Sequence, residues 1–399
     1  MGLGGWAPGA AGPAGGTGVP VRVRGRAGSV GAGAGGGGVL RVGVSCGLER
    51  KRLGGSGLSV SEVTLGTMTW GKQNSEADAH AQLDVAFGEL GINAVDTAEL
   101  YPVPPQEGTA GRTDLYLGSW LRGQRREDVV LMSKVSGYAP HLAYLRDAGV
   151  TTRLTEEQMR ESVDKSLARL GTDYLDVLQL HWPDRYVPMF GQGTYRSALA
   201  REDAVGFEEQ LVGLGKLVEA GKVRHVGLSN ETPYGLMRFL QVAREHGLPV
   251  VSSVQNAYNL LVRADEGGLA EVLHNTDTAY LAYSPLAGGM LTGKYAMGEV
   301  DGARLSMFDN YMVRYKGDLA REATGRYAEV ARRHGMTPTQ LALSFVASRD
   351  WMTSVIVGAT SVKQLRENVD AVANSVWNED VERDVDEVYA RFRDPTTST

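Results

Sequence analysis

The feature that most constrains the fold of this chain is a regular alternation of short apolar runs with amphipathic segments, from about residue 49 to the C-terminus. The apolar runs read as buried strands, and the segments between them have the apolar spacing of helices. We expect eight strands, at Val63–Thr67, Ile92–Asp96, Val129–Lys134, Tyr174–His181, Val223–Ser229, Val250–Gln255, Ala279–Ser284 and Ser354–Val357. Eight strand-then-helix units predict an α/β chain that folds as one (β/α)8 TIM barrel over residues 49–399, with a short hairpin at Glu49–Val60 closing its bottom.

Local signals at the helix ends support this reading. Three pairs have the spacing of a capping box, prolines occupy first-turn positions, and glycines follow helix ends: Ser75 with Asp78, Thr155 with Gln158, Ser361 with Gln364, Pro233, Pro338, Gly171 and Gly247. The alternative is an open doubly wound sheet, which requires a glycine fingerprint after its first strand. None follows Val63–Thr67, and the G-x-G-x-x-G at Gly31, Gly33 and Gly36 lies in low-complexity sequence without a following helix.

Residues 1–48 form a separate region that we expect to be disordered. They contain 18 of the 52 glycines and offer little apolar surface to bury. Four arginines and no acidic residue suggest an organelle transit peptide, with the chloroplast as first choice and the mitochondrion as second. The alternative is an upstream extension from a misplaced start codon, which would leave a cytoplasmic protein.

Composition excludes several classes of protein. The single cysteine, Cys46, cannot form an internal disulfide, and the seven histidines show no paired metal-ligand spacing, so no metal site is expected. No apolar run approaches the ~20 residues that span a bilayer. Because residues 1–48 carry four positive charges, the rest of the chain is more acidic than the formal net charge of −6, which argues against nucleic acid as a partner.

Polar residues gather where the predicted strands end, which is where barrel enzymes place their active sites. Asp96, Lys134 and His181 end the second, third and fourth strands. A buried lysine needs a partner, and Asp96 supplies one. Tyr101 follows Asp96 by five residues, and a neighbouring ammonium would lower its pKa from about 10. In this set, Tyr101 could protonate the carbonyl oxygen of a substrate while His181 donates a hydrogen bond to the same oxygen. Hydride would reach the carbonyl carbon.

Hydride transfer requires a cofactor, and further strand ends could orient one. Ser229, Asn230 and Gln255 could bind an amide such as the nicotinamide carboxamide, and Tyr283 offers a ring face. Gly358–Ser361 lead into a helix N-terminus, which is the usual phosphate site in barrels.

These residues resemble the aldo-keto reductases. The stretches Asp96-Thr97-Ala98-Glu99-Leu100-Tyr101, Ser133-Lys134 and Leu180-His181-Trp182 look like the family's catalytic Asp, Tyr, Lys and His, in its order and on its strands. The resemblance extends over nearly all of residues 49–399. The runs from Gly66 to His80 and from Tyr101 to Pro105 are similar to the bacterial Tas-type group within the family.

The resemblance implies a barrel that uses NADPH to reduce a small aldehyde or ketone. Tyr101 would be the acid, Lys134 and Asp96 its tuning pair, and His181 the residue that orients the carbonyl. The residues implied to bind NADPH/NADP+ are Thr67, Met68, Ser229, Asn230, Gln255, Tyr283, Ser284, Leu286, Lys294, Arg304, Gly358, Ser361, Gln364, Glu367 and Asn368. The charges of Lys294 and Arg304 suit a 2′-phosphate. Trp182 would form an apolar wall of the substrate pocket or pack under a loop.

Two other functions fit the same resemblance. Aldo-keto reductase barrels also resemble the beta subunits of voltage-gated potassium channels, so a cofactor-sensing regulatory subunit is an alternative. A binding barrel without turnover is a further one, although all four catalytic positions hold the expected residues. The loops at residues 137–153 and 185–206, which carry several tyrosines and Phe190, would shape substrate choice.

Overall fold

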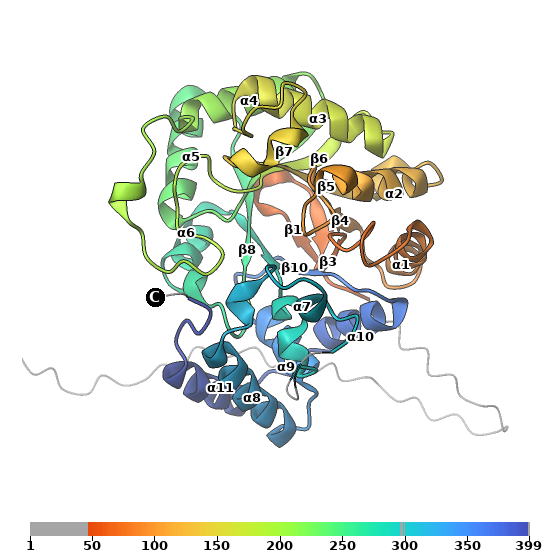
Figure 1. Ribbon diagram of the computed structural model, residues 1–399, viewed down its shortest axis with the longest axis vertical. Helices are drawn as coiled ribbons and strands as arrows, with labels where there is room; N and C mark the ends of the chain where they lie inside the picture. Colours follow the sequence, from red (N-terminus) through yellow and green to blue (C-terminus); the bar gives the residue numbers. More distant parts are fainter. Residues whose placement is uncertain (1–46, 296–297, 299, 398–399) are drawn as a thin grey trace, which may run out of the picture. The chain divides into compact units, whose positions relative to one another are not determined.

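The computed structural model describes residues 47–295, 298 and 300–397. The predicted disordered extension at residues 1–48 therefore lies, except for its last two residues, outside the described part of the chain. The described residues form a closed barrel of eight parallel strands surrounded by helices (Figure 1). This confirms the predicted (β/α)8 fold.

All eight predicted strands are present, and each differs from its predicted bounds by at most a few residues. In order around the barrel they are β10 (Ser354–Val357), β3 (Val63–Gly66), β4 (Ala94–Asp96), β5 (Val130–Val135), β6 (Leu175–Leu180), β7 (Val223–Ser229), β8 (Val251–Ala257) and β9 (Ala279–Tyr283). The first and last barrel strands, β3 and β10, pair in parallel and close the barrel.

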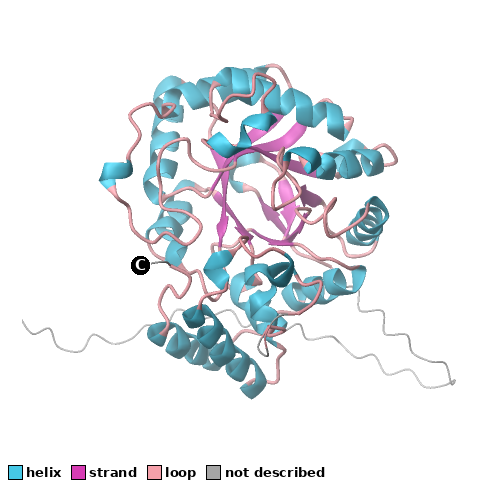
Figure 2. Cartoon of the chain, viewed as in Figure 1, coloured by secondary structure: helices cyan, strands magenta, loops and turns pink. Residues whose placement is uncertain are grey.

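Helices enclose the barrel, and Figure 2 shows them in cyan around the magenta strands. They are α1 (Glu76–Gly88), α2 (Arg112–Leu121), α3 (Glu156–Leu170), α4 (Phe207–Glu219), α5 (Pro233–His246), α6 (Gly268–Thr276), α7 (Arg304–Met307), α8 (Asp318–Arg333), α9 (Pro338–Ala347), α10 (Val362–Ala373) and α11 (Glu379–Arg391). None of the helices within the described ranges is long and apolar enough to cross a membrane.

The helix-end predictions hold for the glycines and prolines and in part for the capping boxes. Gly171 and Gly247 end α3 and α5 in the left-handed conformation, and Ser75 forms a complete capping box with Asp78. Thr155 and Ser361 also accept a hydrogen bond from the third residue of their helices. The reciprocal bond is missing in both, because Gln158 and Gln364 turn their side chains to other partners.

Two apolar layers hold the barrel together. The larger lies between strands and helices and includes Leu131, Leu178 and Leu180. The smaller lies inside the barrel, where Val130, Met132 and Val177 meet residues of the hairpin formed by β1 (Arg50–Arg52) and β2 (Ser59–Ser61). The hairpin therefore closes the bottom of the barrel, as predicted, and leaves the opposite end for polar side chains.

Candidate active site

Strand alternation carries Lys134 and Gln179 to the inside of the barrel. On β5, Val130 and Met132 pack inside while Leu131 and Val135 face the helices, so Lys134 continues the inner row. On β6, Val177 lies inside, and Gln179 follows it. The register pairs Lys134 with Gln179, so the two side chains lie next to each other.

Asp96 is the centre of a buried network at the mouth of the barrel. Its Oδ2 accepts a hydrogen bond of 2.5 Å from Lys134 Nζ, and its Oδ1 accepts bonds from Gln179 Nε2 at 3.0 Å and Gln255 Nε2 at 2.8 Å. The Asp96 and Lys134 side chains are 3% and 1% exposed, so this is a fully buried ion pair. A buried ion pair is tolerated when hydrogen bonds satisfy its remaining polar atoms, and here both carboxylate oxygens of Asp96 accept such bonds.

Tyr101 is brought to this pair by a short turn. The Tyr101 amide bonds Ala98 O at 3.0 Å, and Lys134 Nζ donates to Thr97 O at 2.9 Å and to the Tyr101 hydroxyl at 3.3 Å. The prediction that the pKa of Tyr101 is lowered is wrong. Burial, together with the Asp96 carboxylate, raises the pKa of Tyr101 well above its ordinary value. The phenol therefore stays protonated at neutral pH.

His181 follows β6 and faces the same mouth. Its ring lies edge-on to Tyr101, with centroids 5.9 Å apart, and its buried Nδ1 atom has no hydrogen-bond partner among the described residues. Burial and the nearby Lys134 ammonium lower the pKa of His181 well below its usual value. The imidazole is therefore neutral, and it can donate one hydrogen bond to a substrate oxygen.

An apolar cluster lies beside these polar groups. Tyr101 packs with Ala98, Leu100, Ala139, Leu142 and Leu145, and Met68 and Trp182 lie against that cluster while half-buried. The Trp182 ring is 4.7 Å from the His181 ring, and its Nε1 donates to Tyr138 O at 3.2 Å. Trp182 thus packs against the loop at residues 137–153, as in one of its two expected roles, and its ring also lies next to His181.

The residues expected at a nicotinamide lie on three adjacent strand ends. Asn230, in the left-handed conformation, donates from Nδ2 to His181 O at 2.8 Å, and its Oδ1 accepts from the Tyr283 hydroxyl at 2.6 Å. Ser229 donates to Gln255 O at 2.8 Å. Gln255 Nε2 bonds both Asp96 and Gln179, so its side-chain nitrogen is committed inside the barrel.

Two basic side chains lie close to each other without a carboxylate partner among the described residues. Arg304, at the start of α7, donates to Gln73 Oε1 at 3.2 Å. Lys294 packs closely over Gly289, since a Cβ atom at that glycine would lie only 3.1 Å from Lys294 Nζ. Burial, and then the charge of Arg304, lower the pKa of Lys294. Burial likewise lowers the pKa of Arg304. Because no acid among the described residues neutralises these two cations, together they form a candidate site for anions.

The remaining expected cofactor residues lie around β3, β9 and β10. Thr67 donates to Asp96 O at 2.8 Å, and Ser284 and Leu286 lie between β9 and the turns that lead to Lys294. Ser361 caps α10, Gly358 and Glu367 are exposed, and Asn368 is buried on the inner face of α10. Thr67, Ser284 and Gly358 thus directly follow strands, whereas Gln364, Glu367 and Asn368 lie on α10. The side chains of Thr67, Ser361 and Gln364 already bond within the protein.

Sequence reasoning missed several residues that hold the catalytic segment. Gln179 bonds Asp96, and it could have been found because it lies two residues before His181, on the same strand face. Thr97 donates to the buried Asp114, which Arg169 neutralises at 2.8 Å. No local pattern links those three residues. No group of three or more His, Cys, Asp or Glu side chains in the described ranges could hold a metal ion.

Comparison with known proteins gives a consistent family. The model of the aldo/keto reductase family matches residues 62–390. Protein tas of Escherichia coli (strain K12) is 42% identical over 352 residues, which cover 87% of this chain and 99% of the relative. The L-glyceraldehyde 3-phosphate reductase of the same organism is 29% identical over 340 residues, or 83% of this chain and 89% of the relative.

A relative whose name gives it a different role also matches. A putative voltage-gated potassium channel subunit beta of Schizosaccharomyces pombe is 29% identical over 326 residues, which cover 80% of this chain and 87% of the relative. The family match nevertheless extends over most of the barrel, including the strand ends that carry Asp96, Lys134 and His181. This chain therefore belongs to the aldo/keto reductase family of oxidoreductases.

Proposed function

We propose that this protein is an NADPH-dependent reductase of small aldehydes or ketones in which Tyr101 donates the proton. The observation that carries the proposal is the contact of Lys134 Nζ with both Asp96 and the Tyr101 hydroxyl, beside an imidazole whose Nδ1 has no partner among the described residues. A carbonyl oxygen placed between Tyr101 and His181 would meet two donors. This arrangement stabilises the oxygen where negative charge develops.

The proton step follows from the surroundings of Tyr101. NADPH, when bound, supplies the hydride that reduces the carbonyl carbon. Tyr101 then protonates the oxygen, which as an alkoxide is a stronger base than a phenolate. Although burial raises the pKa of Tyr101, the transfer is still favourable, and Lys134 at 3.3 Å donates a hydrogen bond to the phenolate that forms. His181 stays neutral and orients the oxygen.

The cofactor residues divide into two groups by chemistry. Ser229 and Asn230 at the end of β7 and Tyr283 at the end of β9 are joined by hydrogen bonds through Asn230, which also bonds His181 O, and they would hold the nicotinamide. Lys294 and Arg304 form the anion site and would hold phosphate. The two charges favour NADPH, with its extra phosphate, over NADH. The residues of α10 would complete the adenosine end.

A regulatory subunit is a second candidate, because of the relative named as a putative potassium channel subunit beta. Such a protein would bind NADPH through the same residues with little turnover. A reductase and a regulatory subunit would therefore differ in turnover rate and in binding partner, while their cofactor sites would be alike.

The test is the loss of NADPH absorbance by the full chain and by residues 49–399, with a panel of small aldehydes and dicarbonyls and with NADH in parallel. The proposal predicts steady turnover that prefers NADPH, at the same rate for both lengths of chain. Tight NADPH binding with no turnover on any carbonyl would contradict the reductase and favour the regulatory subunit.

A further inference from the structure

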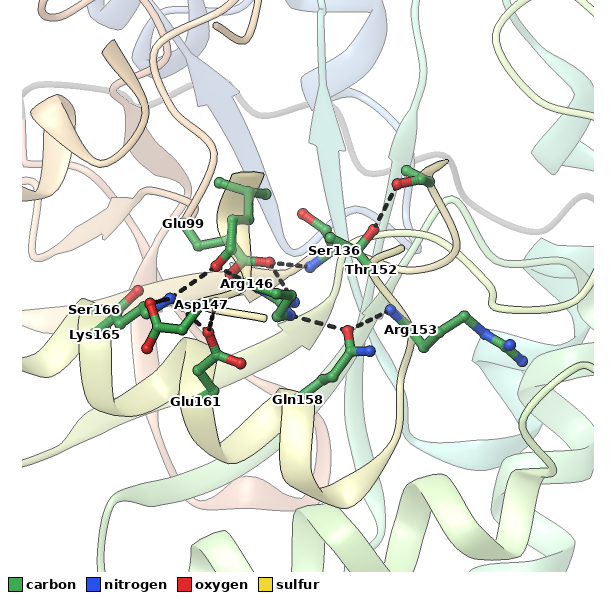
Figure 3. A network of polar contacts seen from close by, with 12 residues as sticks. Glu99, Ser136, Arg146, Asp147, Thr152, Arg153, Gln158, Glu161, Lys165 and Ser166 are labelled. Carbon is green, nitrogen blue, oxygen red and sulfur yellow. Dashed lines mark hydrogen bonds and ion pairs between the residues drawn. The ribbon is translucent and has the colours of Figure 1, made fainter. Parts of the chain in front are cut away.

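A second buried ion pair, Glu99 with Arg146, lies close in sequence to Tyr101, and the proposed proton transfer does not use it. Glu99, two residues before Tyr101, accepts hydrogen bonds from Arg146 Nη1 at 2.8 Å and from Arg146 Nη2 at 3.1 Å. The Glu99 and Arg146 side chains are 3% and 0% exposed. Figure 3 shows the pair at the centre of a polar network that extends to α3.

Glu99 ties the tyrosine segment to the strand that carries Lys134. Its Oε1 accepts from the Ser136 amide at 2.7 Å, just past the end of β5, and its own amide bonds Lys134 O at 3.2 Å. Glu99 is thereby fixed to β5 on both sides of Val135. The position of Tyr101 relative to Lys134 thus depends on this carboxylate.

Arg146 ties the same carboxylate to the loop at residues 137–153. Its Nε donates to Gln158 Oε1 at 3.0 Å, in the first turn of α3, and the same oxygen accepts from the Arg153 amide at 2.8 Å (Figure 3). Apolar residues of that loop, Ala139 and Leu142 among them, pack in the cluster that contains Tyr101. The loop and the tyrosine therefore share one apolar contact surface and one buried ion pair.

The energetics indicate a role other than stability. Desolvation of two ions cancels much of their attraction, so a buried pair can often be replaced by apolar residues without loss of stability. The contact that the pair would protect is sensitive to position, because the 3.3 Å between Lys134 Nζ and the Tyr101 hydroxyl is already at the long end for a hydrogen bond. A shift of a few tenths of an ångström in the segment would break it.

We propose that Glu99 and Arg146 are positioning residues that couple the loop at 137–153 to Tyr101, so that the hydroxyl is held at Lys134 only while the loop is seated. The proposal rests on the reductase function and deepens it. It makes the loop that borders the substrate pocket a determinant of the rate of proton transfer as well as a wall of the pocket.

The test uses three full-length variants. Glu99→Gln removes the charge, and Glu99→Met combined with Arg146→Met removes the whole pair while leaving apolar side chains. Asp176→Asn is the matched control, because Asp176 also accepts from an arginine, Arg126 Nη2 at 2.7 Å, and from a β5 amide, Leu131 N at 3.0 Å, but at the bottom of the barrel. Each variant is measured for Tm, kcat, KM, NADPH Kd and solvent isotope effect.

The proposal predicts a fall in kcat of about 10- to 100-fold for Glu99→Gln and for the double variant, with a larger solvent isotope effect and an unchanged NADPH Kd. The double variant should regain Tm without regaining kcat, whereas Asp176→Asn should lower Tm and keep kcat. A double variant with native Tm and native kcat would overturn the proposal. Failure of both Glu99 variants to fold would also overturn it, since the pair would then be a requirement of the fold.

Hydrogen exchange gives a readout that does not need turnover. Peptides that cover residues 97–101 and 137–153 should exchange faster together in the double variant, and neither should change in Asp176→Asn. If the wild-type protein shows no turnover, the reductase function fails while this result still supports the coupling. Independent exchange of the two segments would refute the coupling even in an active enzyme.

Discussion

Replacing Asp96 with asparagine is the perturbation whose size the structure defines best. The carboxylate accepts from Lys134 at 2.5 Å and from the side-chain amides of Gln179 and Gln255. An asparagine oxygen can face either the ammonium or the two amide donors, so its NH2 group must oppose a donor on the other side. Removing one partner of a buried ion pair costs about 3–5 kcal/mol of unfolding free energy when the remaining charge stays buried.

The same substitution changes two pKa values in one direction. Burial lowers the pKa of Lys134, and the Asp96 carboxylate counters that effect. Burial raises the pKa of Tyr101, and the carboxylate adds to that effect. Without the carboxylate both pKa values fall. Because Tyr101 must be protonated to act as the acid, the basic limb of the kcat/KM profile should move to lower pH. This holds whether the limb reports the ionisation of Tyr101 or that of Lys134.

The assay is chemical denaturation of Asp96→Asn beside wild type, followed by a pH profile of kcat/KM. We expect a loss of about 3–5 kcal/mol in unfolding free energy and a basic limb at lower pH. Asp265→Asn serves as a control for the loss of a buried carboxylate that faces no cation. A variant of Asp96 with less than about 1 kcal/mol of destabilisation and an unmoved limb would refute the account of the Asp96–Lys134 pair.

Three further predictions follow from other residues. His181→Gln should lower kcat/KM severely, and the wild-type profile should show no limb near pH 6.5, because the imidazole is neutral there; such a limb, lost in the variant, would contradict this. Arg304→Met should weaken NADPH binding by about 10- to 100-fold and NADH binding much less, measured by titration of protein fluorescence; equal losses would place Arg304 away from the extra phosphate. Burial raises the pKa of Asp265 to about 6, so the folded state binds a proton that the unfolded chain has released between about pH 4 and pH 6. Stability from this group therefore falls as pH rises through that window, by at most about 3 kcal/mol, and Asp265→Asn should abolish the slope in denaturation curves.

The barrel could be predicted because its signals are local. Most strand residues are buried and most helices have an apolar face, so the alternation of short apolar runs with amphipathic segments located all eight strands. The catalytic set could be predicted for a related reason. In a parallel barrel every strand ends at the same mouth, so Asp96, Lys134 and His181 had to converge once the strands were placed.

The details that the sequence did not reveal depend on pairs far apart in the chain. Glu99 and Arg146 are 47 residues apart, and no local pattern pairs a residue after β4 with one in the loop at 137–153. The direction of the Tyr101 pKa shift depends first on the burial of the hydroxyl and then on the nearby Asp96 carboxylate, and both require coordinates. The missing capping box of α3 has a similar cause. The Gln158 side chain accepts a hydrogen bond from Arg146, which is distant in sequence, and so does not bond the start of its own helix.

The most direct test of the central claim is single-turnover reduction of a small aldehyde by the NADPH-loaded full chain, with Tyr101→Phe alongside. The phenylalanine ring keeps its place in the apolar cluster, and Lys134 keeps its bonds to Asp96 and Thr97, so folding and NADPH affinity should be nearly unchanged. We predict that NADPH oxidation slows by about 10²- to 10⁴-fold in the variant. A variant that binds NADPH normally and turns over at the wild-type rate would show that Tyr101 is not the proton donor.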